Sequence, residues 1–358
     1  MNRKKIKLGE LCKTPKGQIK ESPNTVIDYI DISSVDSNSK TITGYQTMPF
    51  SEAPSRARKS VEKRSVIVST VRPNLNAVAV FEKETTNKPV VSTGFCVLDS
   101  KENVDYRFIF YFCRSKTFID DMVSQATGAS YPAVTDKIIR SALIPEYSYK
   151  EQCEISSVLD RVAQIIESRK KELSALDDLI KARFVEMFGN PITNTKELET
   201  MSLKDVLVLK AGDFTAASDI SDEPNEINKY PCYGGNGIRG YVAEYNQKGE
   251  YSLIGRQGAL SGNVQYAKGQ FKNTEHALLV TPIIEMNSVW LNHLLINLDL
   301  KRYQTGAAQP GLSVKNLQEI QIITVPIDEQ KSFADFVQQV DKSKFIAKEK
   351  VNVMYHYY

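Results

Sequence analysis

The chain has 358 residues, of which 41% are hydrophobic and 25% are charged, and its formal net charge is +3 at pH 7. This composition is typical of a soluble globular protein, and the length favours two domains over one. Because no run of about 18 apolar residues is present and the five cysteines show no Cys-x-x-Cys spacing, we expect a cytoplasmic protein without a membrane span, a disulfide framework or a zinc site.

Residues 1–72 carry an excess of positive charge. They contain 14 Lys and Arg against 7 Asp and Glu, and they lack the apolar stretch of a signal peptide. A local basic patch can bind nucleic-acid phosphates while the rest of the chain binds a protein partner. A solvated surface is the more usual role of such a cluster, but we consider four of its residues for phosphate contact: Arg56, Arg58, Lys59 and Arg64.

Residues 1–147 form the first predicted domain, a mixed α/β unit with short strands. Runs of β-branched and aromatic residues, bounded by Gly, Pro and Asn, predict strands at 65–71, 77–81 and 90–98. We expect an aromatic helix over 108–118, followed by a strand-like apolar run at 138–145.

The turn between the first two of these strands carries side chains suited to DNA recognition. Arg72, Asn74 and Asn76 all lie on it. Arg matches the acceptor edge of guanine, and Asn matches the donor and acceptor edge of adenine. An ordinary turn with incidental polar residues explains the same pattern, so both interpretations stay open.

A long helix with a coiled-coil seam is predicted for residues 148–189. The seam alternates steps of four and three residues, a mean spacing of 3.5 that is typical of coiled coils. Apart from Arg169 its members are apolar: Ile155, Leu159, Val162, Ile166, Leu173, Leu176 and Ile180. The helix should end near 188, where Gly189 and Pro191 follow, and would be roughly 55–60 Å long.

The second predicted domain spans residues 190–326. Its expected strands lie at 251–255, 263–266 and 276–280, with a helix over 289–298. A glycine-rich loop at 230–240 lacks the spacing of a nucleotide-binding motif. This loop and the turn at 255–263 provide the second set of DNA-binding candidates: Tyr233, Asn236, Arg239, Arg256, Gln257 and Asn263.

The chain repeats itself at a spacing of 178 residues. Thr305 follows Thr127 at this spacing, and Gln330 follows Gln152, each Gln in a Glu-Gln pair. The same spacing places a second seam in a shorter helix at 327–358, interrupted by Lys344 but otherwise apolar at Phe333, Val337, Val340 and Val351. Self-similarity at one long period indicates two copies of a domain, each followed by a helix.

No catalytic constellation stands out in the sequence. The three histidines are far apart, and no Gly-x-Ser-x-Gly motif or amino-methyltransferase motif is present. Asp328 and the following Glu-Gln-Lys resemble a nuclease metal cluster, but Asp328 is more simply an N-terminal helix cap. We therefore expect no catalytic residue and no metal site.

Residues 179–191, Leu-Ile-Lys-Ala-Arg-Phe-Val-Glu-Met-Phe-Gly-Asn-Pro, resemble the central conserved segment of type I restriction–modification specificity subunits. The pattern Thr-Gly-Ala-x-x-Pro, then a strand, Glu-Gln and a long helix, resembles the end of each of their target-recognition domains. The resemblance implies an α+β fold with pseudo-two-fold symmetry. Its target-recognition domains would be residues 1–147 and 190–326, and its antiparallel coiled-coil helices residues 148–189 and 327–358.

The resemblance also implies a function. Each target-recognition domain reads one half of a split site in double-stranded DNA, and the helices fix the gap between the halves. Two methyltransferase subunits dock on the helices, and endonuclease subunits join to cut unmethylated DNA. S-adenosylmethionine, ATP and Mg²⁺ belong to these partners, so the chain itself would be non-catalytic and would need no cofactor.

Other interpretations of the sequence remain. The chain resembles, with equal architecture, the specificity subunit of a related system whose partner fuses nuclease and methyltransferase. A protein-only scaffold, with two modules on a coiled coil and no DNA role, is a different class. A stand-alone nuclease or methyltransferase has no motif in its favour.

Overall fold

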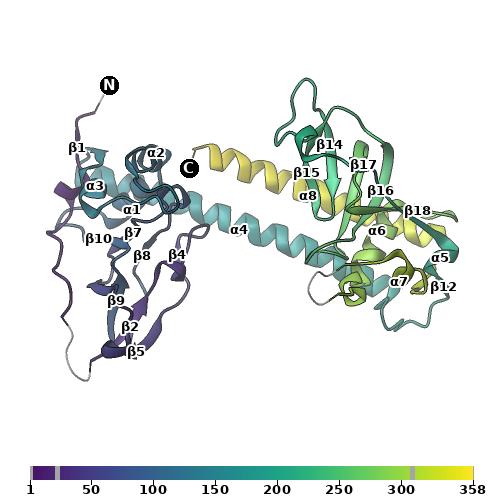
Figure 1. The fold of residues 1–358 in the computed structure, drawn as a ribbon, viewed down its shortest axis with the longest axis horizontal. Coiled ribbons are helices and arrows are strands. Elements are labelled where there is room, and N and C mark those ends of the chain that lie inside the picture. Colours follow the sequence, from purple (N-terminus) through teal and green to yellow (C-terminus); the bar gives the residue numbers. More distant parts are fainter. Residues whose placement is uncertain (1–2, 21–24, 307–310, 358) are drawn as a thin grey trace. The chain divides into compact units, whose positions relative to one another are not determined.

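The structure, a computed structural model, describes residues 3–20, 25–306 and 311–357. The chain divides into two units, residues 1–165 and 166–357, and the boundary lies inside the long helix α4 (Tyr149–Phe188). The elements of each unit are labelled in Figure 1. Residues 307–310, which complete the second Thr-Gly-Ala-x-x-Pro segment, lie outside the described residues.

The first unit contains two main sheets built from β-branched and aromatic runs. One has the strand order β5 (Gln46–Pro49), β2 (Val26–Ile30), β9 (Lys88–Ser92), β6 (Ala57–Ser60), with β2 and β9 parallel. The other has the order β10 (Phe95–Leu98), β7 (Val66–Ser69), β8 (Val78–Val80). Two short pairs complete the strands: β1 (Lys5–Lys7) with β11 (Leu143–Pro145), and β3 (Val35–Asp36) with β4 (Thr41–Ile42).

Three helices precede α4 in this unit: α1 (Tyr106–Arg114), α2 (Lys116–Gln125) and α3 (Asp136–Ser141). The single helix expected over 108–118 is wrong, because Ser115 ends α1 and caps α2 by accepting a hydrogen bond from the amide of Phe118. The strand-like run at 138–145 begins instead as α3, which Thr135 caps, and only its last residues pair as β11. The strand expected over 90–98 is two strands, because the chain turns at Gly94.

The second unit is built on a six-stranded sheet. Its order is β13 (Leu207–Ala211), β18 (Ala277–Pro282), β16 (Gln247–Gly255), β17 (Val264–Asn273), β14 (Tyr230–Gly234), β15 (Gly237–Val242). A short pair, β12 (Thr200–Ser202) with β19 (Gln321–Ile323), lies beside α5 (Leu203–Val206) and α7 (Val314–Gln318). Helix α6 (Ser288–Asn297) packs on β16, β17 and α8 (Ile327–Tyr357), as Figure 1 shows. The sheet and α6 thus form one core with the end of the chain.

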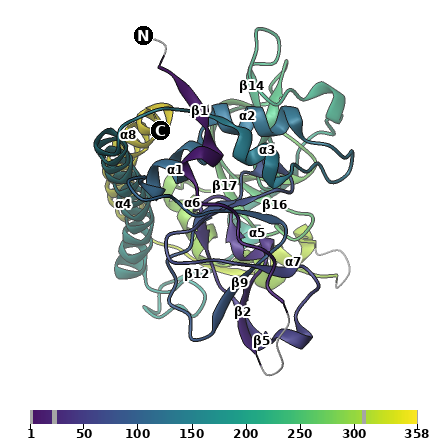
Figure 2. The ribbon, with the colours of Figure 1, turned by 90° about the vertical axis from the view of Figure 1, so that its left-hand side faces the viewer.

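Helix α8 packs against the second half of α4 in antiparallel orientation (Figure 2). Phe333 contacts Phe184 and Phe188 with ring centroids 5.4 and 5.8 Å apart, and Phe188 contacts Trp290 of α6 at 6.0 Å. All four rings are fully buried, so this cluster fixes the two helices to the sheet domain.

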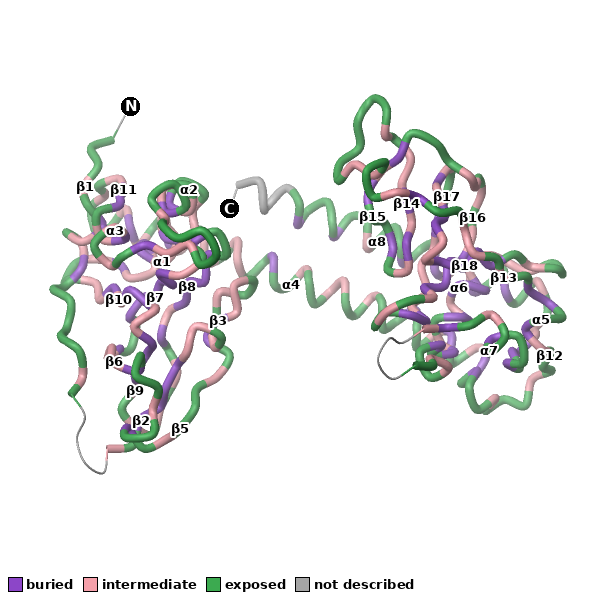
Figure 3. Tube along the Cα trace, viewed as in Figure 1, coloured by how far each residue is buried: buried purple, intermediate pink, exposed green. Residues whose placement is uncertain are grey.

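The predicted seam positions are the less exposed positions of both helices (Figure 3). Ile166, Ile180, Phe333, Val337, Val340 and Val351 are buried, and Ile155, Leu159, Val162, Leu173 and Leu176 are half-buried. The break at Lys344 is accommodated, because its ammonium lies 2.6 Å from Asp177 of α4 and 3.4 Å from Asp341. The predicted α+β fold with two long antiparallel helices is confirmed.

The repeated Glu-Gln pair has a structural role at the start of each long helix. Gln152 accepts a hydrogen bond from the amide of Asp105 at 3.1 Å and donates to the carbonyl of Tyr147 at 2.8 Å. Gln330 makes the same two bonds, both at 2.9 Å, with Asn287 and Val325. Asp105 and Asn287 are the N-caps of α1 and α6, so each glutamine joins a long helix to the aromatic helix of its own unit.

Candidate nucleic-acid interface

The turn between β7 and β8 presents an arginine on a well-anchored backbone. Arg72 is exposed, has a left-handed backbone (φ 50°) and leads into a 3-10 turn at Pro73–Leu75. Its amide donates to the carbonyl of Pro132 at 2.7 Å, and its guanidinium lies 4.8 Å from the ring centre of Tyr131. Two segments far apart in sequence, the turn and the Thr-Gly loop, therefore form one surface.

The asparagines of this turn have different environments. Asn74 is exposed beside Arg72, and Leu75 next to it is 52% exposed. Asn76 is 8% exposed and donates a hydrogen bond to the carbonyl of Cys113 at 2.8 Å. Because Asn76 holds the turn onto α1 from inside, the structure speaks against our prediction that its side chain contacts DNA.

The turn after β16 repeats the same hydrogen-bond frame. The amides of Ser69 and Gly255 donate to the carbonyls of Ala77 and Asn263, at 2.8 and 2.9 Å. In each unit the Thr-Gly loop also donates to the turn: the amide of Val134 to the carbonyl of Thr70 at 2.8 Å, and the amide of Leu312 to the carbonyl of Arg256 at 2.9 Å. The two turns are therefore equivalent parts of the two domains.

The frame shows that the two arginines do not occupy equivalent positions. Arg256 is the counterpart of Thr70, and the counterpart of Arg72 is Gly258. Gly258 shares the left-handed backbone, with φ 77°. Gln257, the counterpart of Val71, is the exposed polar side chain of the second turn, while Arg256 is half-buried. Our sequence-based pairing of the turns is thus right for the segments and wrong for the side chains.

The glycine-rich loop lies against the second turn. Asn263 donates a hydrogen bond to Asn236 at 2.8 Å, and a Cβ on Gly255 would lie 2.2 Å from the carbonyl oxygen of Gly235. Only glycine permits this approach. Asn236, Arg239, Gln257 and His276 line a cavity of about 350 Å³ between the two segments.

Tyr233 of this loop has a packing role. Its ring centre lies 5.4 Å from that of Phe271, and its carbonyl accepts hydrogen bonds from the amide and hydroxyl of Thr274. The side chain is half-buried, and burial raises the pKa of the hydroxyl. We therefore leave Tyr233 out of the proposed DNA surface.

The basic cluster of the first unit makes intramolecular contacts. Lys59 is held 2.6 Å from Asp136 and 2.6 Å from the carbonyl of Phe95, with 21% of its side chain exposed. This arrangement joins β6 to α3 and speaks against a phosphate contact by Lys59.

The three arginines of the cluster also have partners within the chain, but two are exposed. Arg56 pairs with Asp31 at 2.7 Å while 54% of its side chain stays exposed, and the exposed Arg64 lies 5.6 Å from the ring centre of Tyr106. Arg58 is half-buried and donates to the carbonyl of Ala57.

Two surface residues escaped the sequence analysis. Tyr131, 68% exposed, belongs to the Thr-Gly loop that the repeat had marked, so the repeat was a usable signal. His276 begins a predicted strand and carries no signal in the sequence, because its partners Gln257 and Glu275 are recognised only from the fold.

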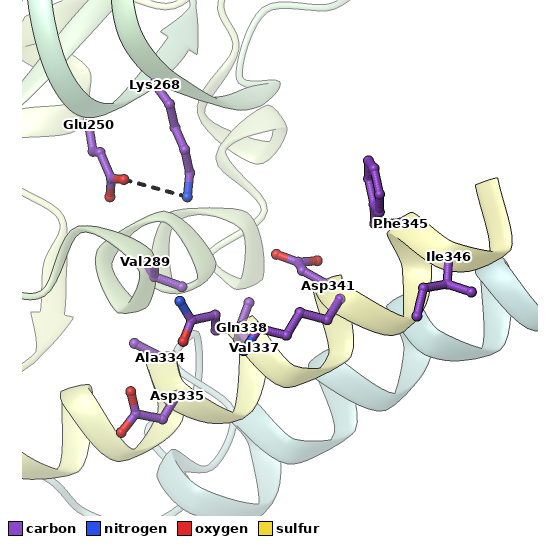
Figure 4. Close-up of a pocket in the computed structure, with 11 residues that line it drawn as sticks. Glu250, Lys268, Val289, Ala334, Asp335, Val337, Gln338, Asp341, Phe345 and Ile346 are labelled. Atoms are coloured by element: carbon purple, nitrogen blue, oxygen red, sulfur yellow. Dashed lines mark ion pairs between the residues drawn. The ribbon is translucent and has the colours of Figure 1, made fainter. Parts of the chain in front are cut away.

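A second surface lies along α8, where a cavity of about 760 Å³ separates the helix from the sheet (Figure 4). Val289, Ala334 and Val337 line it, with the ion pair of Glu250 and Lys268 across from α8. At its edge, two large apolar side chains project from α8: Phe345, 65% exposed, and Ile346, 55% exposed. The seam residues predicted for partner contact face the helix pair instead, so the outer side of α8 offers the accessible surface.

Two searches of the described residues returned no candidates. None of the helices they form is long and apolar enough to cross a membrane. In the same part of the chain, no group of three or more His, Cys, Asp and Glu side chains is placed to hold a metal ion.

The model of the type I restriction modification DNA specificity domain matches residues 2–177 and 195–353. The chain belongs to this family. It is 31% identical over 316 residues to the type I restriction enzyme EcoprrI specificity subunit of Escherichia coli, which spans 84% of this chain and 77% of that protein. The resemblance that residues 179–191 carry is therefore confirmed.

Two solved structures have the same fold. A chain from a study of complex assembly and conformational transition of the type I R-M system matches with a TM-score of 0.64 at 23% identity, covering 99% of this chain and 94% of that one. The type I restriction–modification S subunit from M. genitalium matches with a TM-score of 0.59 at 17% identity, covering 99% and 93%.

Proposed function

We propose that this specificity-family chain reads a split sequence in double-stranded DNA, with the turn at 69–77 and the turn at 255–263 each reading one half. The observation that carries the proposal is the repeated hydrogen-bond frame of the two turns. A shared frame gives both domains the same recognition position, and different side chains on it give each domain its own sequence preference.

The side chains on the two frames match different chemistry. The first turn offers the guanidinium of Arg72, stacked on Tyr131, and the amide of Asn74. The second offers the amide of Gln257 and the guanidinium of Arg239 across the cavity. Charged groups supply phosphate or guanine contacts and amides supply base-edge contacts, so the two half-sites should differ in sequence.

We further propose that the chain performs no chemistry and acts through partners. The exposed apolar residues Phe345 and Ile346 of α8 fit a contact with a methyltransferase subunit, of which the resemblance implies two, and endonuclease subunits would join them. S-adenosylmethionine, ATP and Mg²⁺ would be bound by those partners. The described cysteines are free, which fits work in the reducing cytoplasm beside the DNA.

The experiment that tests the function is a genome-wide map of methylated adenines with and without this gene. Loss of methylation at one split motif is the expected result. Arg72→Ala should then relax the first half of the motif and Gln257→Ala the second, while Arg161→Ala, an exposed arginine of α4, serves as the control. An unchanged map, or a motif that neither turn variant alters, would contradict the proposal.

A further inference from the structure

A three-residue chain of polar contacts stands behind the second turn. Oε1 of Gln257 lies 2.7 Å from Nδ1 of His276, and Nε2 of the same ring lies 3.0 Å from Oε1 of Glu275. Gln257 is exposed, whereas His276 and Glu275 are half-buried beneath it. The remaining oxygen of Glu275, Oε2, is buried and has no hydrogen-bond partner among the described residues.

The contacts define which atoms carry hydrogen. An ionised carboxylate and an amide oxygen only accept hydrogen bonds, so both ring nitrogens of His276 must donate. The ring is then an imidazolium, and its charge balances Glu275, whose other oxygen lacks a donor. With Oε1 of Gln257 occupied by the ring, its NH₂ group is the part left free to face the cavity.

This arrangement changes what Gln257 can recognise. A glutamine that is free to orient presents one donor and one acceptor and pairs with adenine. Gln257 presents donors alone, and guanine carries the matching acceptors, N7 and O6, in the major groove. We infer that His276 and Glu275 are positioning residues that fix Gln257 as a hydrogen-bond donor, so that the second turn reads guanine. The inference rests on the proposed function of the turn.

The first unit supports the assignment by lacking the whole device. The amide of Arg256 donates to the carbonyl of His276, and in the equivalent contact the amide of Thr70 donates to Gly94. The counterparts of Gln257 and His276 are thus Val71 and Gly94, neither of which has a polar side chain. The glutamine and the histidine occur together in one domain and are absent together from the other.

The neighbouring charges are compatible with a positive ring. Glu275 precedes His276 in the chain and pairs with it, and Arg239 of β15 lines the same cavity. An arginine beside the cavity also favours an acceptor-rich base such as guanine over one that presents donors.

The test uses the full chain assembled with its methyltransferase subunits and competition between duplexes that differ from the wild-type motif by one base pair. Gln257→Ala identifies the base pair read by Gln257, because replacing that pair then ceases to matter. We expect guanine there in the wild type, preferred over adenine by roughly 5- to 150-fold, the range for one bidentate contact. His276→Leu should reduce this preference toward equality, because the amide can then rotate.

A second variant separates orientation from simple loss of structure. Gln257→Glu keeps an oxygen for the ring but offers the base only acceptors, so the preference should move to a base with an amino donor, adenine or cytosine. The half-site read by the first unit is the internal control, and its preferences should stay unchanged in both variants.

Two results overturn the inference, and they are distinguishable from failure of the proposed function. If the wild type prefers adenine at this position, or if guanine preference survives both variants while the first half-site stays intact, the inference is wrong and the recognition role stands. If the wild-type complex selects no split motif at all, the proposed function is wrong and the inference is lost with it.

Discussion

The half-buried His293 of α6 should make the second unit sensitive to mild acid. Its ring lies edge-on to Phe333, with centroids 5.4 Å apart, and burial lowers its pKa from 6.5 to about 4. Asp341 and Asp177 oppose this shift and Lys344 adds to it, but loss of solvent around the ring is the largest cause. The perturbation we consider is a change from pH 7.5 to pH 5.0, with His293→Leu as the comparison.

The sign and the size follow from proton linkage. The unfolded chain protonates this histidine below about pH 6.5, whereas the folded chain resists protonation until about pH 4. The neutral ring therefore contributes stability fully above pH 6.5, and this contribution is lost as the pH falls toward 4. At pH 5.0 the difference in proton binding lowers the free energy of unfolding by about 2 kcal/mol.

Urea unfolding followed by tryptophan fluorescence measures this effect directly. Trp290 is the only tryptophan in the chain, is fully buried in α6 and contacts Phe188, so its emission reports on the second unit. Between the two pH values the wild type should lose about 2 kcal/mol more than His293→Leu, which cannot take up the proton. Equal losses in both proteins would refute the linkage argument.

Three further predictions concern the joints of the second unit and use the same fluorescence assay at pH 7.5. Phe333→Ala removes the ring at the centre of the aromatic cluster and should cost about 3–5 kcal/mol; a loss below 1 would contradict its central role. Lys344→Leu should stay within about 1 kcal/mol of wild type, because the leucine continues the apolar seam and Asp177, 65% exposed, returns to water. Gln330→Ala leaves the buried amide of Asn287 without its acceptor and should cost about 1–3 kcal/mol, whereas an unchanged midpoint would show that water replaces the glutamine.

Periodic features of the sequence predicted the large elements well. The long helix expected to end near 188 ends at Phe188, and the second seam repeats the first at Phe333, Val337 and Val340. Such signals are local, since each depends on residues a few positions apart along one helix. The interruptions were missed because Ser115 and Gly94 act through a cap and a turn that apolar spacing does not reveal.

The site was predicted at the level of segments and not of side chains. The structure brings the turn and the glycine-rich loop together, but it buries Asn76 and engages Lys59 with Asp136, 77 positions away in sequence. Partners at such a distance are chosen by the tertiary fold, so composition alone cannot separate a structural lysine from a DNA-binding one. Small insertions also displaced Arg256 from the position equivalent to Arg72.

The left-handed backbone shared by Arg72 and Gly258 has a consequence for protein engineering. A residue with a side chain pays roughly 1–2 kcal/mol to adopt this conformation, and glycine does not. A designer who optimised stability, or who copied the second domain onto the first, would replace Arg72 with glycine. The strained arginine marks a place where stability and recognition conflict, so retargeting this scaffold should begin by leaving such residues free to vary while the hydrogen-bond frame is kept.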